Sequence, residues 1–329
     1  MNSEHPNEPG ADEPGADEDG TGLAPTAGAD VPTGHRAGFA ALVGRPNVGK
    51  STLLNALLGT KLSIVTPKPQ TTRHRILGLL NAADYQIAFV DTPGLHDGRG
   101  RMLNQYMNRS AAASLEDADV LLFVIEALTF APEDEYVLER IKRAGLPTIA
   151  VVNKVDRVVM KPRLLPFLNE LGRRHDFKAM VPISAYKHDN IAELPALIAS
   201  FLPESPPMFP PEQLTDRSPQ FLATEIIREK LMLRLQEELP YGLTVEIERW
   251  EPTEDGRIEV SAVIWVERPG QKAIVIGEGG ELLKQVGRSA RLALNEALGT
   301  RTHVELWVKV KENWADSANA LRAFGYEGL

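Results

Sequence analysis

The chain has 329 residues, of which 43% are hydrophobic, and a formal net charge of −9. This length allows two domains, and the hydrophobic fraction is typical of a globular protein. No apolar run is long enough to span a membrane, and the N-terminus lacks the basic and apolar segments of a secretion signal. The absence of cysteine excludes disulfides and thiolate metal sites, and it favours a reducing compartment such as the cytoplasm.

Much of the negative charge lies at the start of the chain. Residues 1–38 contain eight acidic residues against one basic residue, Arg36, and are rich in Gly, Pro and Ala. This composition offers too little apolar surface to offset the entropy lost on ordering. We therefore expect residues 1–37 to form a disordered acidic arm.

Residues 44–51 read GRPNVGKS and match the phosphate-binding pattern G-x-x-x-x-G-K-[ST]. The apolar run 39–43 predicts a strand before the motif, and residues 51–58 predict a helix after it. In this setting Lys50 would reach the β- and γ-phosphates and Ser51 would hold Mg²⁺. The nucleotide contacts predicted for this loop come from Gly44, Arg45, Pro46, Asn47, Val48, Gly49, Lys50, Ser51 and Thr52.

A polar, proline-broken segment at 61–75 separates this helix from a predicted hairpin with strands at 76–80 and 85–90. A threonine hydroxyl in a mobile loop can complete the Mg²⁺ shell while its backbone N–H contacts the γ-phosphate. We assign this role to Thr72, although a solvated surface threonine is the plain alternative.

The second strand of the hairpin ends in Asp91, Thr92, Pro93 and Gly94. This places a carboxylate at the carboxyl end of a strand, where ligands bind in an open α/β sheet. We expect Asp91 to hold Mg²⁺ through a water molecule and the N–H of Gly94 to meet the γ-phosphate. The predicted Mg²⁺ set is therefore Ser51, Thr72 and Asp91.

Further along, predicted helices at 102–115 and 132–144 alternate with apolar strands at 120–125 and 148–152. Alternation of this kind predicts a doubly wound, mostly parallel sheet, the α/β fold of P-loop proteins.

The residues after the last of these strands are Asn153, Lys154, Val155 and Asp156. A carboxylate only accepts hydrogen bonds, so Asp156 suits guanine, whose ring N–H and amino group both donate; adenine offers no such pair. A next strand end at 181–185 would place Ser184 and the Ala185 N–H beside the guanine carbonyl oxygen. These motifs favour GTP and GDP over adenine nucleotides.

The order GRPNVGKS, QTTRHRI, DTPGLH, NKVD and SA resembles the bacterial Era family of GTPases, over about residues 38–329. The resemblance implies a GTPase domain at 38–202 that hydrolyses GTP to GDP and phosphate. Leu95 follows Gly94, where Ras-like proteins carry the glutamine that orients the attacking water. The resemblance implies slow hydrolysis without that glutamine, and Asn47 suggests the hypothesis that K⁺ supplies positive charge. The predicted catalytic set is Lys50, Thr72, Gly94 and Asn47; His96 is more simply a solvated bystander than a base.

Six prolines between residues 203 and 219 predict a semi-rigid linker. Beyond it the pattern predicts a helix at 221–238, strands at 243–250 and 257–266, a helix at 281–298 and a strand at 302–310. With a G-x-x-G at 277–280 between two helices, this order resembles an α+β KH RNA-binding domain of type II, the prokaryotic type, over 220–329.

A G-x-x-G loop lets the backbone approach the sugar-phosphate chain of single-stranded RNA. Glu278 inside the loop opposes phosphate, and nearby cationic side chains offset it. A helix-linking turn in a protein-binding domain is the alternative. The predicted RNA-binding residues are Lys272, Ile276, Gly277, Glu278, Gly279, Gly280, Lys284 and Arg288.

The C-terminal stretch contains three large aromatic residues, Trp307, Trp314 and Phe324, which we interpret as packing residues rather than base-stacking platforms. The stretch after Lys311 has helical periodicity, so it would either lie over the RNA groove or cap the second domain.

The resemblance to the Era family implies a GTP switch, which we expect to be cytoplasmic and monomeric, although the sequence leaves the oligomeric state open. GTP would reposition the KH domain, which would hold small-subunit ribosomal RNA and assist assembly of the 30S subunit. The alternative is a GTP-regulated scaffold, peripheral at the cytoplasmic face of the inner membrane, whose second domain binds protein or lipid.

Overall fold

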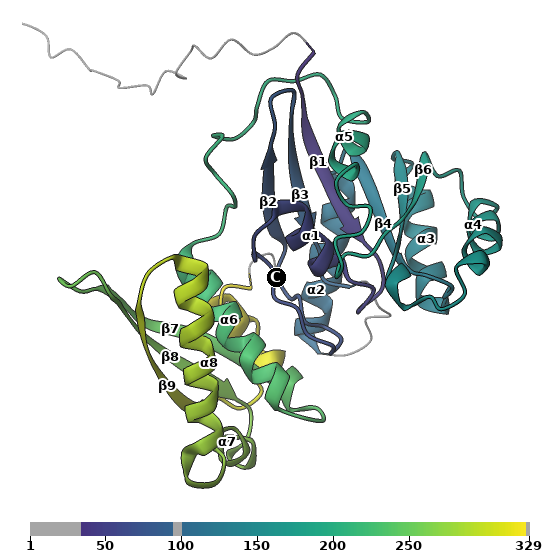
Figure 1. The fold of residues 1–329 in the computed structure, drawn as a ribbon. Helices are drawn as coiled ribbons and strands as arrows, with labels where there is room; N and C mark the ends of the chain where they lie inside the picture. Colours follow the sequence, from purple (N-terminus) through teal and green to yellow (C-terminus); the bar gives the residue numbers. More distant parts are fainter. Residues whose placement is uncertain (1–33, 95–100, 327–329) are drawn as a thin grey trace, which may run out of the picture. The chain divides into compact units, whose positions relative to one another are not determined.

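The computed structural model describes residues 34–94 and 101–326, which contain a six-stranded and a three-stranded sheet (Figure 1). The six-stranded sheet has the order β2-β3-β1-β4-β5-β6. The β2–β3 pair is antiparallel and the other pairs are parallel. Its strands are β1 (Arg36–Val43), β2 (Ile76–Asn81), β3 (Tyr85–Asp91), β4 (Val120–Glu126), β5 (Thr148–Asn153) and β6 (Ala179–Pro182). The predicted hairpin and the mostly parallel, doubly wound sheet are confirmed.

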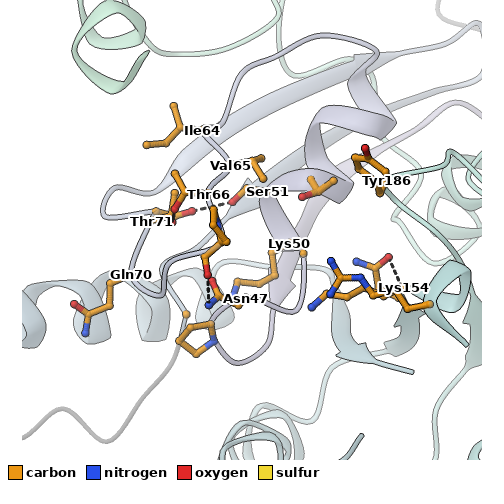
Figure 2. A pocket seen from close by; sticks show the side chains of 18 of the residues that line it. Asn47, Lys50, Ser51, Ile64, Val65, Thr66, Gln70, Thr71, Lys154 and Tyr186 are labelled. Carbon is orange, nitrogen blue, oxygen red and sulfur yellow. Dashed lines mark hydrogen bonds between the residues drawn. The ribbon is translucent and has the colours of Figure 1, made fainter. Parts of the chain in front are cut away.

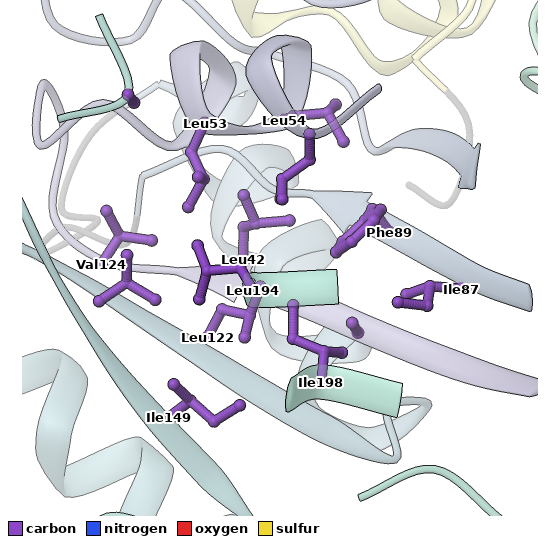
Figure 3. Close-up of a cluster of buried hydrophobic side chains, with 14 of the residues drawn as sticks. Leu42, Leu53, Leu54, Ile87, Phe89, Leu122, Val124, Ile149, Leu194 and Ile198 are labelled. Atoms are coloured by element: carbon purple, nitrogen blue, oxygen red, sulfur yellow. The ribbon is translucent and has the colours of Figure 1, made fainter. Parts of the chain in front are cut away.

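Helices cover both faces of this sheet because its buried strands carry apolar side chains on alternating faces. In β1, Ala40 and Leu42 point to one face, while Ala41 and Val43 point to the other. Figure 3 shows Leu42 meeting residues of α1 and α5. The helices of this part are α1 (Lys50–Leu58), α2 (Met102–Glu116), α3 (Pro132–Ala144), α4 (Leu164–Gly172) and α5 (Leu194–Ala199). Residues of α2, α3 and α4 pack on the opposite face.

The first strand begins at Arg36, two residues inside the segment predicted as a disordered arm. Its backbone pairs in parallel with β3, and His35 Nδ1 lies 2.8 Å from the Ser205 carbonyl oxygen. The rest of the predicted arm, residues 1–33, lies outside the described residues.

The proline-rich segment predicted as a linker runs along the β2 edge of the sheet. Leu79 N–H donates to the Leu214 carbonyl at 2.9 Å, and the Thr215 hydroxyl donates to the Leu77 carbonyl at 2.6 Å. Pro219, predicted as the last linker residue, is instead the first residue of a helix, since its fixed φ suits the first turn.

The C-terminal part, residues 219–326, contains a sheet of order β7-β8-β9, with β7–β8 antiparallel and β8–β9 parallel. Apolar residues of α6 and α8 pack on this sheet. Its elements are α6 (Pro219–Arg234), β7 (Leu243–Pro252), β8 (Ile258–Val266), α7 (Pro269–Ile276), α8 (Glu281–Leu298), β9 (Thr302–Val310) and α9 (Ala318–Ala323). The predicted α-β-β-α-α-β order is confirmed.

The helix predicted at 221–238 ends early, at Arg234. Leu235 adopts an extended conformation, and Leu235 and Leu239 are both buried in the core of the C-terminal part. Packing of these two leucines therefore overrides the helical periodicity of the sequence.

The residues that follow β9 pack against α2 and also against the C-terminal part itself, where the Trp314 ring N–H donates to the Gly242 carbonyl at 3.1 Å and Phe324 lies beside Trp265. Trp314, Leu321 and Tyr326 are buried together with Tyr106 and Met107 of α2. Trp314 is thus a packing residue, as predicted. The same prediction is wrong for Trp307, which is 58% exposed because it alternates onto the outer face of β9. Among the described helices, none is long and apolar enough to cross a membrane.

Candidate nucleotide-binding site

A cavity of about 460 Å³ lies between the phosphate loop (residues 44–51), the switch loop (residues 61–75) and the loops that follow β5 and β6 (Figure 2). Its size is within the range of small-molecule sites. Eleven of the predicted nucleotide and Mg²⁺ residues line it: Pro46, Asn47, Gly49, Lys50, Ser51, Thr52, Thr72, Gly94, Asn153, Lys154 and Asp156. The structure therefore brings together motifs that are up to about a hundred residues apart in the sequence.

Lys50 is held inside the phosphate loop. Its ammonium group donates to the carbonyl oxygens of Gly44 (2.9 Å) and Arg45 (3.1 Å). Burial lowers the pKa of Lys50 to about 8, partly opposed by the carboxylate of Asp91. Gly49 precedes α1 with φ 100°, a conformation that favours glycine. A cation and a helix N-terminus thus converge where phosphate would bind.

The three predicted Mg²⁺ ligands are in contact. Ser51 Oγ donates to Asp91 Oδ2 at 2.6 Å and lies 2.8 Å from the Thr72 hydroxyl. The other Asp91 oxygen, Oδ1, is buried without a hydrogen-bond partner among the described residues. Hydroxyl and carboxylate oxygens suit Mg²⁺, which retains several waters and usually binds one or two carboxylates plus phosphate. These residues fit an Mg²⁺ ion that arrives with a nucleotide.

Gly94 approaches the phosphate loop so closely that it has no room for a side chain. A Cβ atom there would lie 2.8 Å from the backbone nitrogen of Pro46. Just before it, Pro93 is buried and the Thr92 hydroxyl donates to the Leu42 carbonyl at 2.9 Å. Thr92 and Pro93 therefore position Gly94, while Leu95 and His96 lie outside the described residues.

Asn153 joins the base end of the cavity to the phosphate loop. Its side-chain amide donates to the Val48 carbonyl at 2.8 Å, and its Oδ1 accepts from the Ala185 N–H at 3.0 Å. Ser184 Oγ donates to Asp156 Oδ1 at 2.6 Å. One carboxylate oxygen of Asp156 is thus held by the protein, at the cavity wall where guanine would bind.

Arg45 does not line the cavity. Its guanidinium pairs with Asp134 at 3.1 Å and with Glu126 at 3.4 Å. Glu126 also accepts from Lys154 Nζ at 2.8 Å. Arg45 therefore links the phosphate loop to α3 and to the guanine motif. The remaining predicted residues, Gly44, Val48, Asp91, Ser184 and Ala185, likewise support lining residues without lining the cavity themselves.

Sequence reasoning missed several lining residues. Tyr186 is 75% exposed and directly follows Ala185. Its position next to the Ser-Ala motif could have indicated that it lines the cavity. Gln70 and Thr71 of the switch loop belong to the QTTRHRI motif but were not assigned a role, and residues 64–67 belong to none of the quoted motifs. The missed residues are Ile64, Val65, Thr66, Pro67, Gln70, Thr71, Arg157 and Tyr186.

The predicted RNA loop connects α7 to α8. Gly277 has φ 77° and ψ 173°, and a Cβ there would lie 2.7 Å from the Leu282 Cβ, so only glycine fits. Gly279 and Gly280 also have positive φ. Around the loop, Lys272, Lys284 and Arg288 are exposed, as is Glu278, whereas Ile276 is half-buried in the core. The backbone of the G-x-x-G loop and three cationic side chains are thus accessible to a ligand on the same part of the surface.

Two protein families match this chain. The family described as "50S ribosome-binding GTPase" matches residues 39–154, and the family described as "KH domain" matches residues 238–315. These ranges contain the phosphate loop and the G-x-x-G loop, respectively.

Curated relatives match almost the whole chain. GTPase Era of Stenotrophomonas maltophilia (strain K279a) is 51% identical over 296 residues, covering 90% of this chain and 99% of that protein. GTPase Era of Pseudomonas aeruginosa (strain LESB58) is 48% identical over 301 residues, covering 91% and 98%.

Solved Era structures share the fold. An Aquifex aeolicus Era variant bound to GDP·AlF4⁻ has a TM-score of 0.85 at 42% identity and covers 88% of this chain and 99% of that one. Era in complex with MgGDPNP and nucleotides 1506–1542 of 16S ribosomal RNA has a TM-score of 0.86 at 41% identity, covering 89% and 99%. With its phosphate, guanine and G-x-x-G loops in place, this chain belongs to the Era family of GTPases.

Proposed function

We propose that this GTPase binds small-subunit ribosomal RNA through its G-x-x-G loop and assists maturation of the 30S subunit. The observation that carries the proposal is the exposed loop at 277–280, flanked by Lys272, Lys284 and Arg288. None of the ion pairs found among the described residues occupies these three cations. The solved Era complex with 16S ribosomal RNA supports the same ligand class for this chain.

The hydrolytic roles follow from the cavity. Mg²⁺ would be held by Ser51 and Thr72 directly and by Asp91 through water, and it would neutralise phosphate charge. The solved complex with MgGDPNP supports this metal. Lys50 would stabilise the charge that develops on the transferred phosphoryl group, and the Gly94 N–H would donate to it. Asn47 lies at the mouth of the cavity, between these groups and solvent.

RNA binding is tested with Gly279→Asp. Gly279 has φ 58°, and its Cβ would point into open space, so Asp fits without a collision and adds negative charge to the loop. We expect binding of a single-stranded 16S 3′-end oligonucleotide to fall by about tenfold or more in filter binding, because the added charge repels phosphate. GTP hydrolysis in the absence of RNA should be unchanged.

The matched control is Gly299→Asp. Gly299 ends α8 with φ 63°, and its Cβ would also meet nothing within 4 Å. It carries the same strain and charge outside the loop, so RNA binding should remain. Equal losses in both variants would contradict the proposal. Sedimentation with anionic lipid vesicles tests the alternative. If Gly279→Asp reduced vesicle binding and left RNA binding unchanged, the result would favour the membrane-surface scaffold.

Potassium dependence rests on Asn47. Its side-chain amide donates to the Pro67 carbonyl at 3.1 Å, which places Asn47 between the phosphate and switch loops. K⁺ bound there would supply positive charge close to the leaving phosphate. We expect single-turnover hydrolysis to be about tenfold faster in KCl than in NaCl, and Asn47→Ala to remove the difference. Equal rates in both salts, or a K⁺ effect that survives the substitution, would exclude this role.

The remaining proposals concern the state of the protein in the cell. We propose a cytoplasmic monomer that associates peripherally with the inner membrane. Sedimentation equilibrium and fractionation of cells measure these two properties directly.

A further inference from the structure

The two residues that flank Thr72 are both held by the C-terminal part. The Thr71 carbonyl accepts from Arg228 Nη2 at 2.6 Å. On the other side, the Arg73 guanidinium donates to the Leu243 carbonyl at 2.7 Å and to the carbonyls of residues 240 and 241, both at 3.1 Å. Arg73 and Arg228 are each only 1% exposed. The backbone on either side of a predicted Mg²⁺ ligand is thus fixed from outside the nucleotide cavity.

Arg228 is itself oriented by a second buried charge. Glu225, one helical turn earlier on α6, accepts from Arg228 Nε at 2.8 Å and from Arg228 Nη2 at 2.6 Å. The next residue on the same stripe, Glu229, accepts from the Val65 N–H at 3.1 Å and pairs with Lys61 at 2.7 Å. Positions 225, 228 and 229 lie on one face of a helix. This face of α6 therefore contacts the switch loop at Lys61, Val65 and Thr71.

Stability alone does not account for these charges. Desolvation makes a buried ion pair a weak source of stability, and well-packed apolar residues often serve as well or better. What the pair provides is a directed donor: the guanidinium fork is fixed by Glu225 and aimed at one backbone carbonyl. The carbonyl it reaches belongs to the residue before Thr72, whose hydroxyl lies 2.8 Å from Ser51 Oγ.

The opposite face of α6 packs against α8. Ala223 and Ile226 contact Leu294, and Ile227 and Leu231 share a core with Val286. Because α8 begins at the G-x-x-G loop, α6 contacts the switch loop with one face and the helix that follows the G-x-x-G loop with the other.

We propose that Arg228, oriented by Glu225, is a positioning residue for Thr72, so that the C-terminal part helps to set the affinity for GTP over GDP. Thr72 serves a nucleotide only when Mg²⁺ and a γ-phosphate are present. Holding the switch loop in this arrangement lowers the cost of ordering it around GTP and leaves GDP binding unaffected. The coupling is reciprocal, so GTP binding stabilises the contact of α6 with the switch loop.

The test compares nucleotide affinities of the full chain. The double variant Glu225→Gln/Arg228→Met removes the donor together with the carboxylate that orients it, so neither charge of this pair is left alone. We expect its affinity for GDPNP to fall between about 5- and 150-fold, the usual range of coupling between sites. GDP affinity should stay within about twofold, since coupling acts only through the γ-phosphate state. Fluorescence titration with labelled nucleotides measures both.

If Arg228 had only a structural role, the variant would lose affinity for GDPNP and for GDP equally, and its melting temperature would fall. An unchanged ratio of GDPNP affinity to GDP affinity would therefore overturn the proposal. Arg228→Lys provides a second variant that keeps the charge but loses the planar fork, and it should shift the ratio in the same direction. If the double variant does not fold, the ratio in Arg228→Lys decides. Arg234→Lys on the same helix is the control, because Arg234 contacts the Lys230 carbonyl of its own helix, and its ratio should match that of the wild type.

Discussion

Asp156→Asn is expected to reverse the base preference of the site from guanine to xanthine. The carboxylate would accept two hydrogen bonds from guanine, each worth about 1.5–3 kcal/mol because the acceptor is charged. Their loss should weaken GTP and GDP by about 10² to 10⁴-fold. An asparagine would accept from the xanthine ring N–H and donate to its extra carbonyl, so xanthosine triphosphate should bind better than GTP. Competition titration with labelled GDP measures the reversal.

Ser184→Ala provides a graded test of the same site. The Ser184 hydroxyl holds Asp156 Oδ1 at 2.6 Å, so its removal should loosen the carboxylate without changing its chemistry. A smaller loss of about tenfold, with guanine still preferred, is expected for one hydrogen bond. Asp176→Asn is the control, since Asp176 lies on the surface with Lys178. If Asp156→Asn still preferred GTP, the base would have to bind elsewhere.

The parts of the fold that could be predicted from sequence are those with strict local requirements. The phosphate loop needs glycine at fixed positions, and Gly49 indeed adopts φ 100° where a side chain would be strained. The helices at 132–144 and 281–298 have the predicted bounds, because glycine follows each, proline is the first residue of one and glycine precedes the other. Motifs at strand ends meet because parallel strands bring their carboxyl ends to one edge.

Long-range pairing explains what the sequence did not reveal. Arg228 and the Thr71 carbonyl are 157 residues apart, and no periodicity of either segment indicates the contact. Arg45 matches a variable position of the phosphate motif, yet it pairs with Asp134 of α3. The C-terminal segment forms the short helix α9 in keeping with its periodicity, but the periodicity did not indicate that Trp314 and Tyr326 are buried against α2. Each of these contacts depends on tertiary packing, which the local pattern does not specify.

The structure also changes how the motif residues are understood. Asn153 was expected to act on the base, yet its side chain bridges Val48 in the phosphate loop and Ala185. Glu126, which no motif singled out, bridges Arg45 and Lys154. The phosphate loop and the guanine motif therefore belong to one hydrogen-bonded network. A substitution in either motif should alter binding at both ends of the nucleotide.

Lys50→Met is expected to weaken nucleotide binding strongly while leaving the empty protein at least as stable as the wild type. Losing a buried charge that would contact phosphate should cost about 2–5 kcal/mol of binding, or a tens- to thousands-fold weaker affinity for GTP and GDP. The empty protein behaves differently, because burial lowers the pKa of Lys50 to about 8. At pH 7 the folded chain therefore carries a charged ammonium group at a buried position, which costs desolvation free energy. Methionine has a side chain of similar length and no charge, so it removes that cost.

Thermal unfolding with and without nucleotide separates these two effects. A ligand that binds only the folded state raises its stability by RT ln(1 + [L]/Kd), so at the same GDP concentration wild-type protein should gain melting temperature and Lys50→Met should gain much less. Without nucleotide, the variant should melt at the same temperature as the wild type or higher, which shows that it is folded. Lys187→Met, at an exposed lysine beyond the cavity lining, should behave as the wild type in both conditions. A destabilised Lys50→Met that gained as much stability from GDP as the wild type would mean that this lysine supports the fold rather than binding phosphate.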